Sequence, residues 1–165
     1  MARGPAVSLP RIALTVGDPA GIGPEIVATA AADPGVRAVC EPMIFAPPAN
    51  PAIRTGEVSA AAGQAAFETI VSAVTAARRG EVDAIATAPI NKLAFAQAGL
   101  PWKGHTDLLA HLCGAAHVAM LFHAPQLKVV LMTVHVPLRE VAALLTPALV
   151  GNTIRLTAAS LPQFG

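Results

Sequence analysis

The sequence has few charged residues and few cysteines. Asp, Glu, Lys and Arg make up 13% of the 165 residues, against 54% hydrophobic residues, and the formal net charge is +1. This composition argues against intrinsic disorder, and the scattered Lys and Arg residues form no basic surface for nucleic acid or an anionic membrane. Because few polar groups are left to solvate a monomer, we expect a partner surface. Cys40 and Cys113 form no CxxC pattern, which indicates free thiols in a reducing compartment.

The sequence also lacks the pattern of a secretory signal, since no apolar segment follows Arg3. One stretch without Asp, Glu, Lys or Arg, residues 108–127, is long enough to span a bilayer. It contains three histidines and Pro125, which would be costly in hydrocarbon. We interpret it as a helix end followed by a buried strand, and expect a soluble, cytoplasmic protein with no membrane or nucleic-acid partner.

Apolar segments and turn residues alternate in a way that predicts strands alternating with helices. Strands are expected at 11–16, 39–45, 82–87, 118–122 and 129–134. Helices are expected at 24–32, 59–79, 91–98, 106–113, 137–145 and 147–159. Pro42 indicates that the second strand lies at a sheet edge or is short, and the prolines of 46–55 make that segment a connector. The pattern predicts an α/β fold with a largely parallel sheet, in a single region over residues 1–165.

Capping residues predict where several helices begin and end. Ser59, Thr106 and Thr146 are expected to be N-cap residues, and the helix that starts at Pro24 is expected to stop before Asp33-Pro34-Gly35. In the helix after Ser59, one apolar stripe for the core has the spacing i, i+3, i+4 and i+7; it consists of Phe67, Ile70, Val71 and Val74.

The loop after the first strand is rich in glycine but departs from two nucleotide-binding motifs. Its sequence, residues 17–25, is GDPAGIGPE. The third glycine of the dinucleotide motif G-x-G-x-x-G is missing, and so is the G-K-[ST] of a P-loop. Free N–H groups at the following helix start suit an anion. A ligand-binding loop and a tight structural turn therefore both stay open.

Two of the five histidines between positions 105 and 135 are candidate functional residues. His105 lies in a Lys-Gly-His-Thr turn, where Lys103, the imidazole, the Thr106 hydroxyl and helix N–H groups can converge on a phosphate. His135 follows a predicted strand, and neutral imidazole is a common ligand of divalent metals.

The other three histidines have apolar neighbours and are interpreted as packed or surface residues; they are His111, His117 and His123. No H-E-x-x-H motif of the zinc proteases occurs.

Four motifs follow one another along the chain: GDPAGIGPE at 17–25, TAPINK at 87–92, GHTD at 104–107 and TVHVPLR at 133–139. In this order and context they resemble the 4-hydroxythreonine-4-phosphate dehydrogenases of vitamin B6 (pyridoxal phosphate) biosynthesis. The resemblance covers residues 11–165, with a shortened stretch around 46–55. The chain thus resembles the amino-terminal portion of that family.

The resemblance implies a truncated three-layer α/β/α fold like that of the isocitrate and isopropylmalate dehydrogenases, in a homodimer whose active sites use both subunits. It implies NAD-dependent oxidation of 4-phosphooxy-threonine and loss of CO2, assisted by a divalent metal such as zinc, magnesium or cobalt. His105 and Thr106 match substrate-binding positions, and His135 matches a metal ligand. Catalytic and NAD-binding residues are not assigned.

In that family two further histidine ligands and most of the NAD site lie beyond the position of Gly165. A catalytic metal site takes about three protein ligands, so we expect the chain to be incomplete as a catalyst. Two alternatives stay open. One is a dehydrogenase of a related phosphorylated hydroxy acid, phospho-threonate or phospho-erythronate, because the motifs do not define the group opposite the phosphate. The other is a non-catalytic phosphate-binding remnant.

Overall fold

The computed structural model describes residues 8–163, which fall into two compact units. Unit 1 comprises the described residues up to Leu108, and unit 2 those from Leu109 onward. The boundary between the two units falls within one helix, α5 (His105–Cys113).

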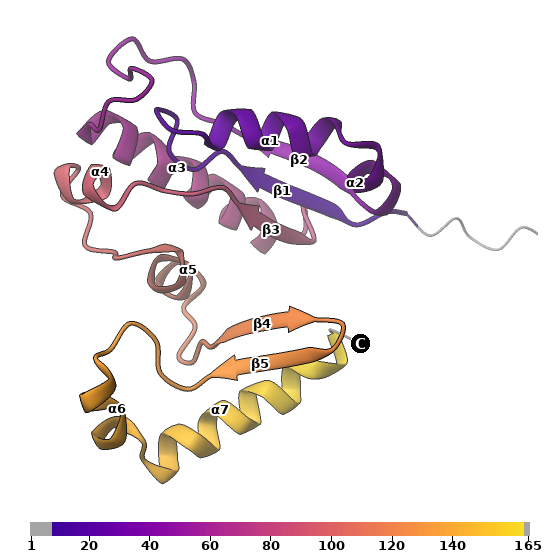
Figure 1. Cartoon of the computed structure of the whole chain (residues 1–165). Coiled ribbons are helices and arrows are strands. Elements are labelled where there is room, and N and C mark those ends of the chain that lie inside the picture. Colours follow the sequence, from indigo (N-terminus) through magenta and orange to yellow (C-terminus); the bar gives the residue numbers. More distant parts are fainter. Residues whose placement is uncertain (1–7, 164–165) are drawn as a thin grey trace, which may run out of the picture. The chain divides into compact units, whose positions relative to one another are not determined.

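Unit 1 is built on a three-stranded parallel sheet with the strand order β2-β1-β3. Its strands are β1 (Arg11–Thr15), β2 (Glu41–Phe45) and β3 (Ala84–Thr87). Its helices are α1 (Gly23–Ala32), α2 (Pro34–Val39), α3 (Ala60–Arg78) and α4 (Lys92–Gln97) (Figure 1). The predicted edge position of β2 is confirmed, because within residues 8–163 β2 pairs only with β1.

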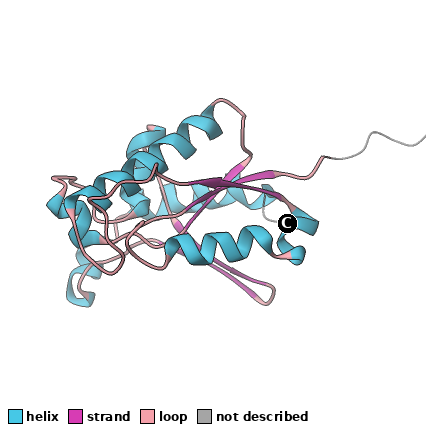
Figure 2. Cartoon of the chain, turned by 90° about the horizontal axis from the view of Figure 1, so that it is seen from above, coloured by secondary structure: helices cyan, strands magenta, loops and turns pink. Residues whose placement is uncertain are grey.

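Helices cover both faces of this sheet. Ala13 packs on one face in a cluster with Ala73 and Ala76 of α3. Leu14, the next residue of β1, packs on the other face in a cluster with Val27 of α1. Successive side chains of a strand point to opposite faces, so β1 contacts both layers. The predicted α/β fold with an α/β/α layering is confirmed for unit 1 (Figures 1 and 2).

The longest helix, α3, follows the predicted pattern. The Ser59 hydroxyl accepts the Ala62 N–H over 3.2 Å, which confirms Ser59 as the N-cap. Of the predicted stripe, Ile70 and Val74 are buried and the other two residues are half-buried. Gly63 lies where α3 meets α4, since a Cβ there would come within 2.2 Å of the Ala94 carbonyl oxygen.

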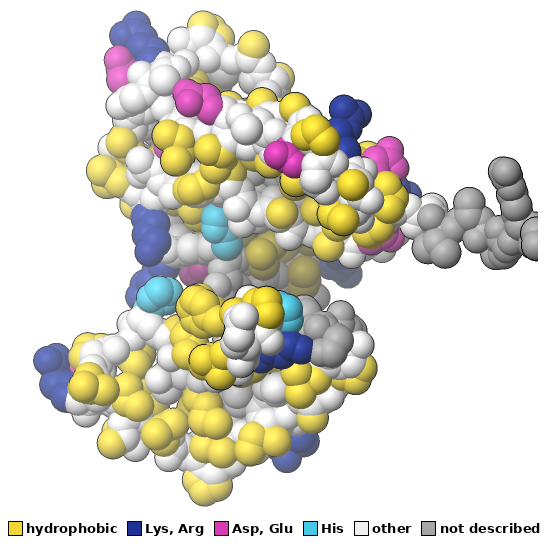
Figure 3. Space-filling view, turned by 45° about the vertical axis from the view of Figure 1, so that its right-hand side comes forward, with side chains coloured by type: hydrophobic (Ala, Val, Ile, Leu, Met, Phe, Trp, Pro, Cys, Tyr) yellow, Lys and Arg dark blue, Asp and Glu magenta, His cyan; other side chains and the backbone are white. Residues whose placement is uncertain are grey.

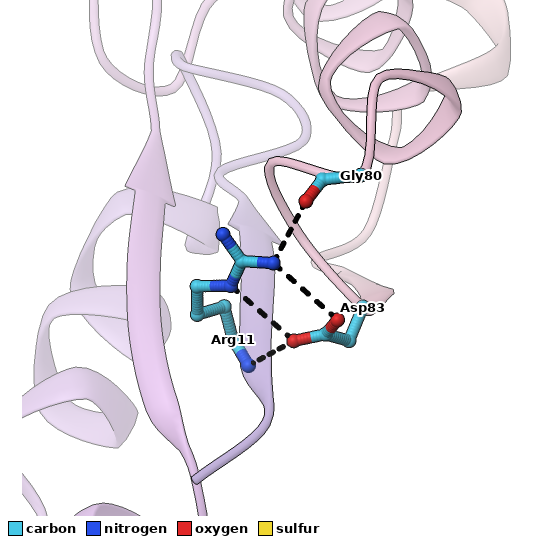
Figure 4. A network of polar contacts seen from close by, with 3 residues as sticks. All are labelled: Arg11, Gly80 and Asp83. Carbon is cyan, nitrogen blue, oxygen red and sulfur yellow. Dashed lines mark hydrogen bonds and ion pairs between the residues drawn. The ribbon is translucent and has the colours of Figure 1, made fainter. Parts of the chain in front are cut away.

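A polar network joins the start of β1 to the connection between α3 and β3. The Arg11 backbone N–H donates to the Asp83 carboxylate over 2.7 Å, and the Arg11 guanidinium donates to the Gly80 carbonyl over 2.7 Å (Figure 4). The backbone N–H of Arg11, and secondly its guanidinium, lower the pKa of Asp83. The network ties the amino end of the central strand to the residues that lead into β3.

One helix was not predicted, and one predicted helix start is wrong. The helix α1 ends before Asp33-Pro34-Gly35, as predicted. The same residues also begin α2, because the Asp33 carboxylate accepts the N–H groups of Gly35 and Val36 over 2.7 and 3.1 Å. The helix α5 begins at His105, so Thr106 lies inside it and is not its N-cap.

Unit 2 consists of a β-hairpin followed by helices. It contains β4 (Met120–Ala124), β5 (Leu127–Leu131), α6 (Leu138–Leu144), α7 (Pro147–Ser160) and the short 3-10 helix η1 (Leu161–Gln163). The strands β4 and β5 are antiparallel, so the expectation of a parallel arrangement is wrong here; a two-residue connection joins only antiparallel strands. The Thr146 hydroxyl accepts the Leu149 N–H over 3.1 Å, which confirms Thr146 as the N-cap of α7.

Unit 2 leaves much apolar surface open. Among its described residues only Thr153 is buried. Phe122, Leu127 and Ile154 are 56%, 65% and 58% exposed, and hydrophobic side chains spread over the face of this unit seen in Figure 3. An apolar groove of about 230 Å³ runs beside the hairpin, lined by residues that include Leu121 and Leu156.

No single helix among the described residues has the length and apolar composition to cross a membrane. Among the described residues, only α6 and α7 taken together have this length and composition, and the chain bends by 90° between them.

Candidate functional site

The two predicted substrate-binding residues of unit 1, His105 and Thr106, are the first two residues of α5 and directly follow a turn. The Asp107 carboxylate binds back onto this turn, where it accepts the N–H of Lys103 over 2.6 Å and the N–H of Gly104 over 2.9 Å. Charge-assisted hydrogen bonds of this kind are short and strong. The backbone just before His105 is therefore held by a side chain two residues further on.

The other end of the turn is anchored by an aromatic contact. Trp102 stacks on Phe67 of α3, with ring centroids 5.2 Å apart and 10° between the ring planes. Both side chains are half-buried. The segment from Trp102 to Asp107 is thus attached to the body of unit 1 at its beginning and closed on itself at its end.

His105 presents a nitrogen that the protein leaves without a partner. The side chain is half-buried, and its Nε2 atom is buried with no hydrogen-bond partner. Burial lowers the pKa of His105, and the nearby Asp107 carboxylate only partly opposes this shift. The imidazole is therefore neutral at physiological pH, and it can donate or accept one further hydrogen bond.

The structure changes which groups near His105 can meet an anion. Burial raises the pKa of Asp107, but the N–H groups of Lys103, Asp107, Gly104 and Leu108 lower it, and the net shift is downward. The carboxylate thus stays ionised and occupies the backbone N–H groups of Lys103 and Gly104, directly before α5. The side chains of His105, Thr106 and Lys103 were predicted to face a phosphate; Thr106 and Lys103 are exposed, and His105 is half-buried.

The glycine-rich loop between β1 and α1 is in large part a packing requirement. Gly17 has a φ of +63°, and a Cβ on it would lie 2.2 Å from the Pro89 carbonyl oxygen. A Cβ on Gly23 would lie 1.7 Å from the Val16 carbonyl oxygen. Only glycine fits at these two positions, so the reading as a tight structural turn accounts for both of them.

Gly21 differs from these two glycines, because a Cβ there would meet no atom closer than 3.6 Å. It lines a cavity of about 470 Å³ at the carboxyl ends of β1 and β3, together with the buried Asp18 and the segment 89–93. In the order β2-β1-β3, β1 is followed by β2 on one side, and the chain then crosses to β3 on the other side of β1. Ligands of open α/β sheets bind at such a reversal of strand order.

His135 lies in unit 2, exposed, between β5 and α6. Its φ is +57°, a conformation uncommon for residues other than glycine. Within residues 8–163 no group of three or more His, Cys, Asp or Glu side chains is arranged to hold a metal ion. His135 alone does not fit a metal centre, which takes about three protein ligands. The side chains of His111, His117 and His123 are exposed.

The sequence analysis missed the roles of Asp107 and Trp102. A signal for Asp107 was present, because an acidic residue three positions after the start of a turn is typical of a side chain that binds backbone N–H groups at a helix start. The Trp102 contact depends on α3, 35 residues earlier in the chain, and has no local signal.

The α/β/α unit is similar to the fold of a solved dehydrogenase structure. The 4-hydroxythreonine-4-phosphate dehydrogenase from Klebsiella pneumoniae matches with a TM-score of 0.84 and 32% identity, over 98% of this chain and 61% of that one. The model of the family described as pyridoxal phosphate biosynthetic protein PdxA matches residues 23–165. The chain belongs to this family.

Two curated relatives differ in the substrate that they are named for. A 4-hydroxythreonine-4-phosphate dehydrogenase of Synechococcus sp. (strain JA-3-3Ab) is 37% identical, over 93% of this chain and 55% of the relative. A D-threonate 4-phosphate dehydrogenase of Cupriavidus necator is 34% identical, over 88% of this chain and 56% of the relative. The chain thus spans little more than half the length of these relatives. The first alignment extends over 192 residues, more than this chain has, so that relative carries additional residues within the aligned region.

Proposed function

We propose that this chain forms the part of an NAD-dependent dehydrogenase that binds a phosphorylated hydroxy acid, and that its substrate is 4-hydroxythreonine-4-phosphate, in vitamin B6 biosynthesis. Membership of the PdxA family supports the reaction class. The observation that carries the assignment to this chain is the buried, unpartnered Nε2 of His105 beside Thr106. A buried polar atom without a partner is costly, and a bound ligand removes that cost.

In the proposed complex each side chain of the turn has one task. The neutral imidazole of His105 makes one hydrogen bond to the substrate, and the Thr106 hydroxyl makes a second. Lys103 supplies a positive charge for the phosphate. NAD, when bound, accepts the hydride from the carbon that carries the alcohol.

A divalent metal (zinc, magnesium or cobalt) with His135 as one ligand also belongs to the proposal, as does a homodimer that works in the cytoplasm. The described residues do not supply a full ligand set around His135, so such a metal needs ligands from elsewhere.

A second candidate substrate is D-threonate 4-phosphate. The Cupriavidus necator relative named for that substrate is almost as similar as the relatives named for 4-hydroxythreonine-4-phosphate. The two compounds differ in the group opposite the phosphate, which the turn before α5 does not distinguish.

Binding and turnover of the two compounds test this proposal. Trp102 is the only tryptophan, and it lies three residues before His105, so its fluorescence reports on the turn. We expect 4-hydroxythreonine-4-phosphate to change this fluorescence saturably, and the same compound without its phosphate to bind much more weakly. NADH formation with one substrate and not the other would decide between them. If neither phosphorylated compound binds, the proposal is wrong.

A further inference from the structure

The Asp107 side chain fixes the path of the chain directly before His105. One carboxylate oxygen, Oδ2, accepts the N–H of Lys103 over 2.6 Å, and the other, Oδ1, accepts the N–H of Gly104 over 2.9 Å. Two bonds to two successive N–H groups leave the turn little freedom to open. From this geometry we infer that Asp107 is a positioning residue, which holds the imidazole of His105 in its half-buried place for the ligand. The inference rests on the proposed function of His105.

The same two bonds restrict what a ligand can contact. Because the carboxylate already occupies the N–H groups of Lys103 and Gly104, these two groups are not available to an anion at this turn. It also meets the negative charge of Asp107, which opposes the approach of a phosphate. Asp107 therefore weakens anion binding through its charge and supports it by holding His105.

The two effects of Asp107 predict opposite changes of the His105 pKa and of the anion affinity in an Asp107→Asn variant. The charge of Asp107 raises the pKa of His105, while burial, the larger effect, lowers it. With a role through charge alone, Asp107→Asn lowers the pKa of His105 further and strengthens anion binding. With a positioning role, the same change exposes the imidazole to water. The pKa of His105 then rises toward its usual value of 6.5, and anion binding weakens.

The test compares the full chain with its Asp107→Asn variant. The ring signals of His105 are followed by NMR over a pH series, with His105→Gln to assign them among the five histidines. We expect the pKa of His105 to rise. Affinity for inorganic phosphate, followed by Trp102 fluorescence, should fall by about tenfold or more, the equivalent of one hydrogen bond to a charged group. An unchanged pKa, or a lower pKa with tighter phosphate binding, overturns the inference.

Asp33→Asn is the matched control. Asp33 also accepts two backbone N–H groups, those of Gly35 and Val36, but at a different helix start of unit 1. This variant should change neither the titration of His105 nor the affinity for phosphate. An equal effect of both variants would show that general stability, and not position, is responsible.

A measurement on the unaltered chain guards against a variant that does not fold. The amide protons of Lys103 and Gly104 should shift together as Asp107 titrates, with one midpoint below 3.8; independent or absent shifts contradict the inference. If the unaltered chain does not bind phosphate, the proposed function loses its phosphate site. The pKa of His105 in Asp107→Asn still decides the role of Asp107.

Discussion

The indole of Trp102 stacks on the ring of Phe67, with 5.2 Å between the centroids. This contact attaches the segment that carries His105 to the longest helix of unit 1. A stacked aromatic pair is worth about 0.5–1.5 kcal/mol beyond the area that it buries. The contact is therefore expected to matter for both the stability of unit 1 and the order of the turn.

Replacing Trp102 by Ala should lower the free energy of unfolding by about 2 kcal/mol. This is less than the roughly 3–5 kcal/mol typical of fully buried aromatic residues, because Trp102 is half-buried. Urea unfolding followed by circular dichroism measures the change. Phe67→Leu serves as the comparison, since it removes the stack but keeps an apolar side chain against Trp102. If neither variant loses stability, the stacked pair has no structural role.

Replacing Asp83 by Ala should lower the urea midpoint at neutral pH, because Arg11 loses the acceptor of its backbone N–H and one of the two acceptors of its guanidinium. The pKa of Asp83 is lower in the folded chain than its usual 3.8. The stabilisation is therefore fully present above about 3.8 and is lost as the pH falls through the folded value. The difference between the two proteins should accordingly shrink in acid. Glu81→Ala, which breaks only the exposed pair with Arg79 at 3.9 Å, is expected to change the midpoint much less.

Unit 2 should exchange its amide hydrogens faster than unit 1. Its strands form a hairpin of only two strands, which is marginal by itself in water, and Thr153 is the only buried residue among those described there. In unit 1 the amides of β1 lie between two strands under helices on both faces. Hydrogen exchange followed by mass spectrometry compares β1 with β4 and β5. Equal protection of all three strands would contradict this prediction and would show that further contacts shield β4 and β5 from solvent.

The chain should not retain stoichiometric zinc after dialysis, because His135 lacks two further ligands among the described residues. Elemental analysis of the dialysed protein measures this directly. The control is His135→Ala, which should give the same low metal content. Tight one-to-one zinc binding that disappears in His135→Ala would show that other ligands assemble around this residue.

Local signals predicted most of unit 1, and their limits explain the exceptions. Ser59 could be predicted as an N-cap, because a serine directly before an apolar stripe commonly begins a helix. Asp33-Pro34-Gly35 suits a helix end and a helix start equally well, and only the bonds to Gly35 and Val36 show the second use.

Pairing between distant segments was less accessible from the sequence. The alternation of elements predicted parallel strands, which holds for β1, β2 and β3. It did not hold for β4 and β5, whose connection is too short for a parallel pair. At the candidate site, His105 and Thr106 could be selected from the sequence as candidate substrate-binding residues. The spacing of Asp107 gives a local signal for a residue that binds backbone N–H groups, but which N–H groups it binds depends on the path of the turn.

The measurement that tests the central claim most directly is a calorimetric titration of the chain and of His105→Ala with 4-hydroxythreonine-4-phosphate. The account predicts saturable binding to the unaltered chain. It also predicts that His105→Ala weakens this binding by about 1.5–3 kcal/mol, the range for a hydrogen bond to a charged group. Equal affinity of the two proteins would contradict the assignment of His105 to the substrate, and with it the proposed role of the turn before α5.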